Sequence, residues 1–166
     1  MAQTLQAFAK QCHDILQLED SPASRGKIAA LLRQALNDAE FVDAQFDAES
    51  PERKIIYEDP DLGFCILAHN YLGAKASPPH DHGPSWAIYG QARGETLMSD
   101  WDLVEPASAD KPGKVKKKRD YKLEPGDAHV YNEGDLHSPT RNGPTRLIRL
   151  EGVNMDTVRR LQFRPV

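Results

Sequence analysis

From Ile55 onward, the chain is a series of short β-forming runs that are separated by turn residues. The runs are KIIYED, FCILAHNYL, SWAIYG, ETLMSDWDLV, KKKRDYKL, AHVYN and TRLIRL. The breaks between them include PGD at 125–127, NEGD at 132–135 and RNGP at 141–144, which are typical turn sequences. Many short strands with regular turns predict an antiparallel barrel or sandwich.

Two helical segments are predicted before this β-rich region. Between Thr4 and Leu18, apolar residues recur at close to helical spacing. Ser21 followed by Pro22 fits an N-cap with proline in the first turn, and the second helix is expected to continue to about Asp38.

The length of 166 residues suits one domain. We expect residues 1–166 to form a single domain, with a helical cap over 1–40 and a β-barrel over 52–152.

Composition argues against several classes of partner. The net charge of −4 gives no reason to expect a nucleic acid. The N-terminal segment lacks the apolar core of a signal peptide, and no run approaches the ~20 apolar residues of a membrane span. Cys12 and Cys65 form no metal or redox motif, so we expect reduced thiols in a cytoplasmic protein without a membrane partner.

The segment from Lys111 to Lys122 is strongly basic. Such a segment can bind RNA or a membrane surface. With a single aromatic residue it offers no stacking platform, so we favour a solvated hairpin whose edge strand is protected by lysines.

The six histidines include the closely spaced pair His80 and His82 in PPHDHG. Residues i and i+2 of a strand point to the same side, so this pair can present two imidazoles to one metal ion. A third ligand must come from elsewhere, and spacing alone leaves both His129 and His137 as candidates.

The residues around this pair resemble a known family. PPHDHG, Gly94, Glu95-Thr96-Leu97 and Asp100-Trp101 are similar, in this order, to the first motif of the cysteine dioxygenase family of thiol dioxygenases, within the cupin superfamily. The later PGD and GDLHSP resemble the second cupin motif. With the two helices, the resemblance implies a mainly β fold: a cupin double-stranded β-helix (jelly-roll) barrel behind an N-terminal helix pair.

The resemblance covers roughly residues 53–151 and implies a metal centre of His80, His82 and His137 that holds Fe(II). A glutamate ligand follows the histidine pair in many cupins, but Trp86 and Ala87 stand at those positions here. Ala87 also lies near the position of the cysteine that some relatives crosslink to a tyrosine.

Further departures affect the substrate side of the site. The family's Ser-His-Tyr array falls on Leu147, Arg149 and Glu151. Its carboxylate-binding arginine corresponds best to Lys54, with Arg53 adjacent.

Candidate catalytic and binding residues come from resemblance and from strand alternation. The resemblance places His69 and Tyr71 on the cavity side of their strand, and alternation allows Tyr89 to point inward. Alternatively, His69 is a packed or exposed histidine and Tyr89 an ordinary core tyrosine.

Arg149 and Glu151 share a face of the last predicted strand. They either point inward and pair with each other, with Arg149 free to bind a carboxylate, or lie solvated at a frayed end. We therefore predict catalytic roles for His69, Tyr89, Arg149 and Glu151. Substrate-binding roles are predicted for Arg53, Lys54, Tyr71 and Arg149.

Three neutral imidazoles leave the charge of a divalent metal uncompensated, which favours anionic ligands and thiolates above all. We expect an Fe(II) dioxygenase that oxidises a small thiol-bearing acid or amine with O2, although imidazole also suits Zn and Ni. The alternatives are a non-catalytic cupin that binds a small ligand, and an O2-independent isomerase, lyase or hydrolase.

Overall fold

Ten strands and three α-helices make up the fold within residues 2–166, the part of the chain that the computed structural model describes. The strands are β1 (Arg53–Glu58), β2 (Cys65–Tyr71), β3 (Lys75–Ala76), β4 (Ala87–Arg93), β5 (Thr96–Glu105), β6 (Gly113–Leu123), β7 (Ala128–Tyr131), β8 (Leu136–Arg141), β9 (Thr145–Glu151) and β10 (Phe163–Pro165).

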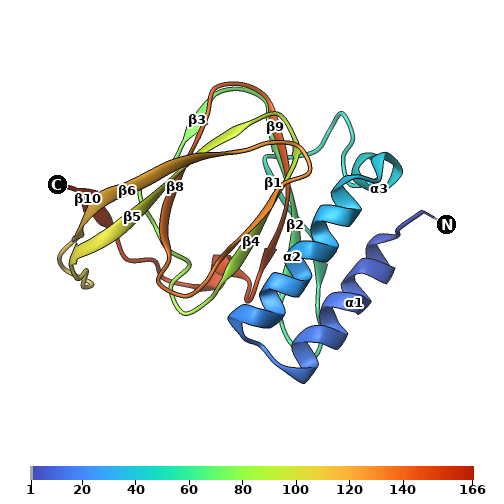
Figure 1. Cartoon of the computed structure of the whole chain (residues 1–166), viewed down its shortest axis with the longest axis horizontal. Coiled ribbons are helices and arrows are strands. Elements are labelled where there is room, and N and C mark those ends of the chain that lie inside the picture. The colour runs from blue at the N-terminus through green and yellow to red at the C-terminus, as the bar shows by residue number, and fades with distance from the viewer. Residues whose placement is uncertain (1) are drawn as a thin grey trace.

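These strands form two five-stranded sheets, in the orders β1-β2-β9-β4-β7 and β10-β6-β5-β8-β3. Strands that are distant in the sequence lie side by side, since β9 pairs with both β2 and β4, and β8 pairs with β5, all antiparallel. Figure 1 shows the two sheets curling around a shared interior. This is the double-stranded β-helix, or jelly roll, of the cupin fold, so the predicted fold class is confirmed.

Both predicted helices are present and begin with local capping. Helix α1 spans Leu5–Leu18, and the Thr4 hydroxyl accepts a hydrogen bond from the backbone N–H of Ala7. Helix α2 spans Pro22–Leu36, with Ser21 as its N-cap in a reciprocal capping box.

Two short helices were not predicted. Helix α3 (Ala39–Asp43) begins because the Asp38 carboxylate accepts from the backbone N–H groups of Glu40 and Phe41. A 3₁₀ turn, η1 (Met155–Thr157), follows β9 and leads into the C-terminal segment.

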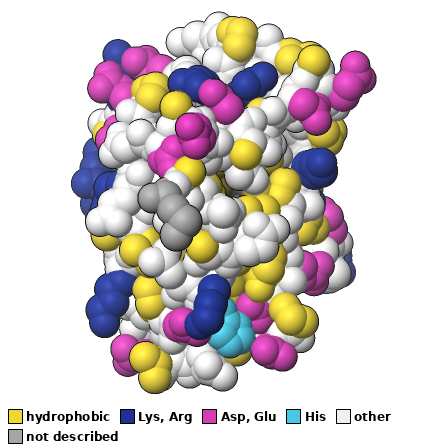
Figure 2. All heavy atoms as spheres, turned by 90° about the vertical axis from the view of Figure 1, so that its right-hand side faces the viewer, with side chains coloured by type: hydrophobic (Ala, Val, Ile, Leu, Met, Phe, Trp, Pro, Cys, Tyr) yellow, Lys and Arg dark blue, Asp and Glu magenta, His cyan; other side chains and the backbone are white. Residues whose placement is uncertain are grey.

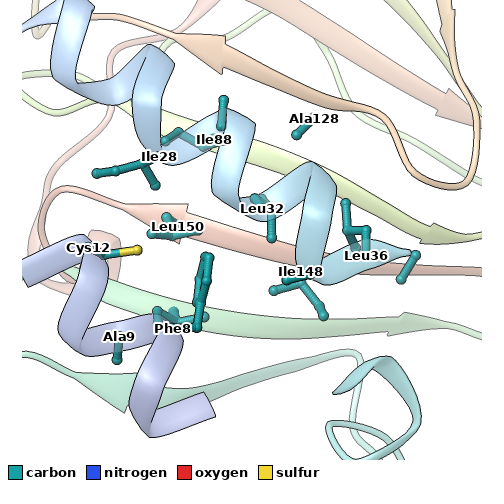
Figure 3. Packing of buried hydrophobic residues seen from close by; sticks show 14 of the residues in the cluster. Phe8, Ala9, Cys12, Ile28, Leu32, Leu36, Ile88, Ala128, Ile148 and Leu150 are labelled. Atoms are coloured by element: carbon teal, nitrogen blue, oxygen red, sulfur yellow. The ribbon is translucent and has the colours of Figure 1, made fainter. Parts of the chain in front are cut away.

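Helices α1 and α2 cover the outer face of the sheet that contains β4 and β9. Figure 3 shows the apolar side chains that meet there, among them Ile28, Leu32, Leu36, Ile88, Ile148 and Leu150. Burying each such side chain contributes roughly 1.5–3 kcal/mol. Because alternate strand residues point to opposite faces, Ile148 and Leu150 turned toward the helices leave Arg149 and Glu151 turned into the barrel.

The basic segment forms most of β6, which pairs with β5 as a hairpin. Its basic side chains have acidic partners on β5 or, for Glu95, directly before it, in the pairs Lys114–Glu105, Arg119–Asp100, Lys118–Asp102 and Lys122–Glu95. These exposed pairs give the hairpin a mixed charge.

Charges are also mixed on the helical side of the molecule. Figure 2, which faces this side, shows Lys and Arg side chains beside Asp and Glu, with apolar atoms between them. Among the described residues, no helix is both long and apolar enough to cross a membrane.

Candidate metal centre

Backbone hydrogen bonds hold His80 and His137 together. The N–H of each donates to the carbonyl of the other, both at 2.9 Å, in an isolated antiparallel bridge. His82 reaches the same point from the loop before β4, and its ring stacks on His137 at 5.2 Å between centroids. One ring nitrogen from each of the three histidines lies within 4.8 Å of the others.

The local structure of the histidine pair differs from the prediction. His80 and His82 lie in a loop rather than in a regular strand, and only His80 makes a β-bridge. Their convergence therefore depends on the contact with β8 and on the turn after His82. There, Asp81 accepts from the Gly83 N–H, and Gly83 has a φ of 59° that suits glycine.

Hydrogen bonds orient two of the imidazoles. Nδ1 of His80 donates to the Pro78 carbonyl at 2.9 Å, and Nδ1 of His137 donates to the Asp135 carbonyl at 2.8 Å. Since a neutral imidazole carries one proton, the lone pair of each ring is on Nε2. Such Nδ1–H contacts to carbonyls are typical of metal-binding histidines.

The free ring nitrogens converge on the Tyr89 hydroxyl. Nε2 of His82 and of His137 each lie 3.1 Å from this oxygen, and Nε2 of His80 lies 3.5 Å from it. The Tyr89 hydroxyl has one hydrogen, so it can donate to the lone pair of His80 or to that of His137, but not to both. A divalent cation would satisfy both lone pairs, so the donor set fits a metal ion.

Burial keeps all three imidazoles neutral. It lowers the pKa of His80 to about 4 and the pKa of His137 well below its ordinary value. Burial and the neighbouring His137 ring also lower the pKa of His82 strongly. Neutral imidazole is the form that binds metals, so the site needs little deprotonation to accept one.

His129, the other candidate third ligand, lies apart from this group. It is on β7, against the rings of Tyr121 and Tyr131 at 5.2 and 4.7 Å between centroids. The structure thus assembles the set that the family resemblance implied.

A cavity of about 1050 Å³ opens beside the histidines. The predicted residues that line it are Arg53, His69, Tyr71, His80, Tyr89, Arg149 and Glu151. Lys54, which we predicted to bind substrate, is exposed and does not line the cavity, because alternate residues of β1 face opposite sides.

His69 and Tyr71 form a buried pair on the cavity wall. The Tyr71 hydroxyl lies 3.1 Å from His69 Nδ1, and the two rings are stacked. Burial lowers the pKa of His69 well below its ordinary value, so its imidazole is neutral. Its Nε2 is buried and has no hydrogen-bond partner within residues 2–166.

Arg149 and Glu151 point into the barrel and pair at 3.6 Å. The Arg149 guanidinium also lies over the Tyr89 ring, 4.0 Å from its centroid. Arg53 contacts Glu151 at 3.4 Å and Asp156 at 2.8 Å, so it bridges the cavity wall to the turn after β9.

Arg141 is a cavity residue that the sequence analysis missed. It ends β8 on the same side as His137, is 2% exposed, and lies over the Tyr71 ring at 4.5 Å from its centroid. Its four-residue spacing from His137 on one strand was the available signal.

Comparisons with known proteins find likeness in fold. No family model matches the chain, and no curated protein matches it. KdgF from Halomonas sp. is similar over 68% of this chain and 91% of its own, with 19% identity and a TM-score of 0.47. A Klebsiella pneumoniae protein with a double-stranded β-helix domain is similar over 66% of this chain and 80% of its own, with 14% identity and a TM-score of 0.47.

A cupin superfamily protein from Desulfitobacterium hafniense is similar over 66% of this chain and 83% of its own, at 9% identity and a TM-score of 0.44. The strand order and the histidine cluster of the chain itself define its class. It is a cupin-fold protein with a three-histidine candidate metal site that opens into a basic cavity.

Proposed function

We propose that this protein is a metal-dependent oxidoreductase, a non-haem Fe(II) dioxygenase of the cysteine dioxygenase type. Its substrates are a small thiol-bearing acid or amine and O2, and its product is a sulfinate. The reaction forms two S–O bonds, since RSH and O2 give RSO2⁻ and a proton. Both oxygen atoms enter the product, and no external reductant is needed.

The composition of the histidine group is the observation that carries this proposal. Three neutral imidazoles converge, and no carboxylate of residues 2–166 belongs to the group. Fe(II) bound there would keep its full positive charge, favour a thiolate ligand and supply the chemistry of O2 activation. Zn(II) and Ni(II) also suit imidazole ligands, so the iron is part of the proposal.

Residues of the chain have separate tasks in this proposal. Burial raises the pKa of Tyr89, so its hydroxyl stays protonated and can donate a hydrogen bond beside the histidines. His69 lines the same cavity, and its Nε2, which has no hydrogen-bond partner within residues 2–166, offers a second contact. Arg149, which is paired with Glu151, lies over the Tyr89 ring from the adjacent strand and supports it.

An oxygen electrode tests the proposal. Protein loaded anaerobically with Fe(II) is mixed with cysteine, cysteamine or 3-mercaptopropionate, and O2 uptake is followed with mass analysis of the product in ¹⁸O2. We expect uptake with at least one thiol and two labelled oxygens in the sulfinate. His137→Ala should abolish uptake, and His129→Ala should retain it.

The absence of the Ser-His-Tyr array favours a second candidate. Leu147, Arg149 and Glu151 occupy the corresponding positions of β9. If no thiol drives O2 uptake, the better description is a cupin that binds a small ligand, or that acts on one without O2.

A further inference from the structure

The buried side chains of the cavity lack hydrogen-bond acceptors. Within residues 2–166, five buried side-chain atoms have no hydrogen-bond partner: His69 Nε2, His82 Nδ1, Arg141 Nε, Arg141 Nη2 and Arg149 Nε. Four of the five belong to residues that line the cavity, and His82 belongs to the candidate metal centre. Buried polar groups without a partner are rare because each costs roughly 1–3 kcal/mol.

The unpartnered cavity atoms share one chemical character. The three guanidinium nitrogens can only donate hydrogen bonds. His69 Nε2 also donates in the tautomer whose Nδ1 accepts from the Tyr71 hydroxyl. The missing partner of this wall is therefore a hydrogen-bond acceptor with more than one oxygen.

The charges of the buried residues also indicate that the missing partner is an anionic hydrogen-bond acceptor. Arg149 is compensated by Glu151, whereas no ion pair found in residues 2–166 includes Arg141. Two other basic groups at the cavity have carboxylate partners, since Lys75 pairs with Glu52 and Arg53 with Asp156. Arg160 and Arg164 also line the cavity, but their side chains are exposed to solvent. Arg141 is thus a buried charge without a counter-charge, which is costly unless a ligand supplies one.

We propose that Arg141 anchors the carboxylate of the substrate. The planar guanidinium offers Nε and Nη2 side by side, and this edge matches the two oxygens of one carboxylate. The Tyr71 ring supports the guanidinium from one face, and His69 Nε2 supplies a further donor on the same wall. One uncompensated charge fits one carboxylate.

This assignment narrows the proposed substrate, and in that respect it rests on the proposed function. A mercapto acid places its carboxylate at Arg141 and its sulfur toward the histidines. An aminothiol would instead add a positive charge to a cavity wall that already has more basic than acidic side chains. The substrate class is therefore a mercaptocarboxylate.

Anaerobic calorimetry with two matched ligands tests the assignment without turnover. 3-Mercaptopropionate and 3-mercaptopropionamide differ only in the carboxylate, and propionate tests that group without a thiol. We expect the acid to bind about 10- to 100-fold more tightly than the amide. Arg141→Met should remove this preference and leave the binding of the amide unchanged. Equal binding of acid and amide by the wild type, or a preserved preference in Arg141→Met, would overturn the assignment.

Two further variants keep the result interpretable. Lys116→Met removes one exposed positive charge from β6, outside the cavity, and should keep the full preference for the acid. Arg141→Lys keeps the positive charge but loses the planar guanidinium that makes two parallel hydrogen bonds, so it should weaken the preference for the acid. This variant tests the assignment even if Arg141→Met does not fold. An unchanged preference in Arg141→Lys would contradict the two-point contact.

The results separate this inference from the proposed function. A preference for the acid without O2 uptake from any thiol would retain the carboxylate anchor and reject the dioxygenase. O2 uptake with thiols, combined with equal binding of acid and amide, would retain the dioxygenase and reject the anchor.

Discussion

Single residues in the second histidine motif have different surroundings although they lie close together in the sequence. His137 has its Nδ1 fixed by the Asp135 carbonyl and its Nε2 directed at Tyr89. His129 packs on Tyr121 and Tyr131 instead, and it lines a separate, smaller cavity. Metal affinity should therefore distinguish the two.

We expect His137→Ala to lose metal binding and His129→Ala to retain it. Replacing one of three ligands removes a large part of the binding energy, whereas His129 offers no nitrogen to the group. Metal content after dialysis, measured for Fe(II) and Zn(II), checks this. If His129→Ala lost the metal and His137→Ala retained it, the register assigned to the second motif would be wrong, and His129 would be the third ligand.

Tyr89 is expected to be a neighbour of the metal rather than a ligand. Burial raises the pKa of its hydroxyl, so the phenolate that a metal would prefer is disfavoured. Tyr89→Phe should keep metal affinity and lower O2 uptake, because the hydroxyl donor is lost. A metal affinity reduced as much as in His137→Ala would instead identify Tyr89 as a ligand.

At the scale of elements, the contact of α2 with β4 depends on a glycine. A Cβ at Gly90 would lie 2.7 Å from the Ile148 carbonyl oxygen and 2.7 Å from Leu32 Cδ2. The carbonyl belongs to a paired strand and cannot move freely, so α2 would be pushed outward. Gly26, exposed in α2, has nothing within 4 Å of its Cβ position.

These two glycines predict opposite effects of the same substitution. Gly90→Ala should destabilise the protein by about 1–3 kcal/mol, as overpacked cores do. Gly26→Ala should stabilise it by about 0.5–1 kcal/mol, because alanine is the better helix former. Urea unfolding at equilibrium measures both, and equal effects of the two substitutions would contradict this packing.

A polar contact also ties α1 to the turn after β1. His13 Nδ1 lies 2.9 Å from the buried Asp59 carboxylate, which also accepts from the Tyr57 hydroxyl. The Asp59 contact raises the pKa of His13. The protonated form is therefore favoured by folding, and its contribution is full below the ordinary pKa of about 6.5 and is lost as pH rises through the raised value.

The stability difference between wild type and His13→Gln should follow this titration. We expect the difference to be largest at about pH 6 and to shrink toward about pH 9. Urea midpoints across this range check it. His129→Gln is the control, since burial lowers the pKa of His129 and its difference should stay flat above about pH 6.5. A pH-independent difference for His13→Gln would show that the ion pair does not contribute.

Periodicity and turn chemistry predicted most elements, because α1, α2 and the main strands bury apolar residues at their own period. Helix α3 was missed because a single turn has no period to detect. The loop conformation of His80 and His82 was also missed, since it depends on backbone contacts with the distant β8.

Within the site, strand parity allowed Tyr89 to point inward and left the Arg149–Glu151 pair either inward or solvated; all three residues line the cavity. Arg141 was overlooked because it is the first residue of the turn sequence RNGP and resembles a solvated loop residue. Its guanidinium packs on the Tyr71 ring, which comes from the distant strand β2. The spacing from His137 indicates which side of β8 Arg141 faces, but its burial by a distant strand has no local sequence signal.

At the scale of the whole molecule, charge is distributed unevenly. The chain has a net charge of −4, yet among the described residues six basic and two acidic side chains line the cavity beside the histidines. Lys75, Arg160 and Arg164 are exposed at it, whereas Arg141 and Arg149 are buried. A local positive field of this kind attracts small anions to a protein that otherwise repels them.

Exposed and buried charges of the cavity should affect different rate constants. Salt screens exposed charges over about 10 Å at 0.1 M but screens buried contacts much less. Stopped-flow binding of 3-mercaptopropionate should therefore show an association rate that falls with ionic strength and a dissociation rate that changes little. Arg160→Gln should slow association and reduce its salt dependence, whereas Arg141→Met should mainly speed dissociation. If Arg160→Gln mainly sped dissociation and Arg141→Met mainly slowed association, then Arg160, and not Arg141, would hold the bound carboxylate.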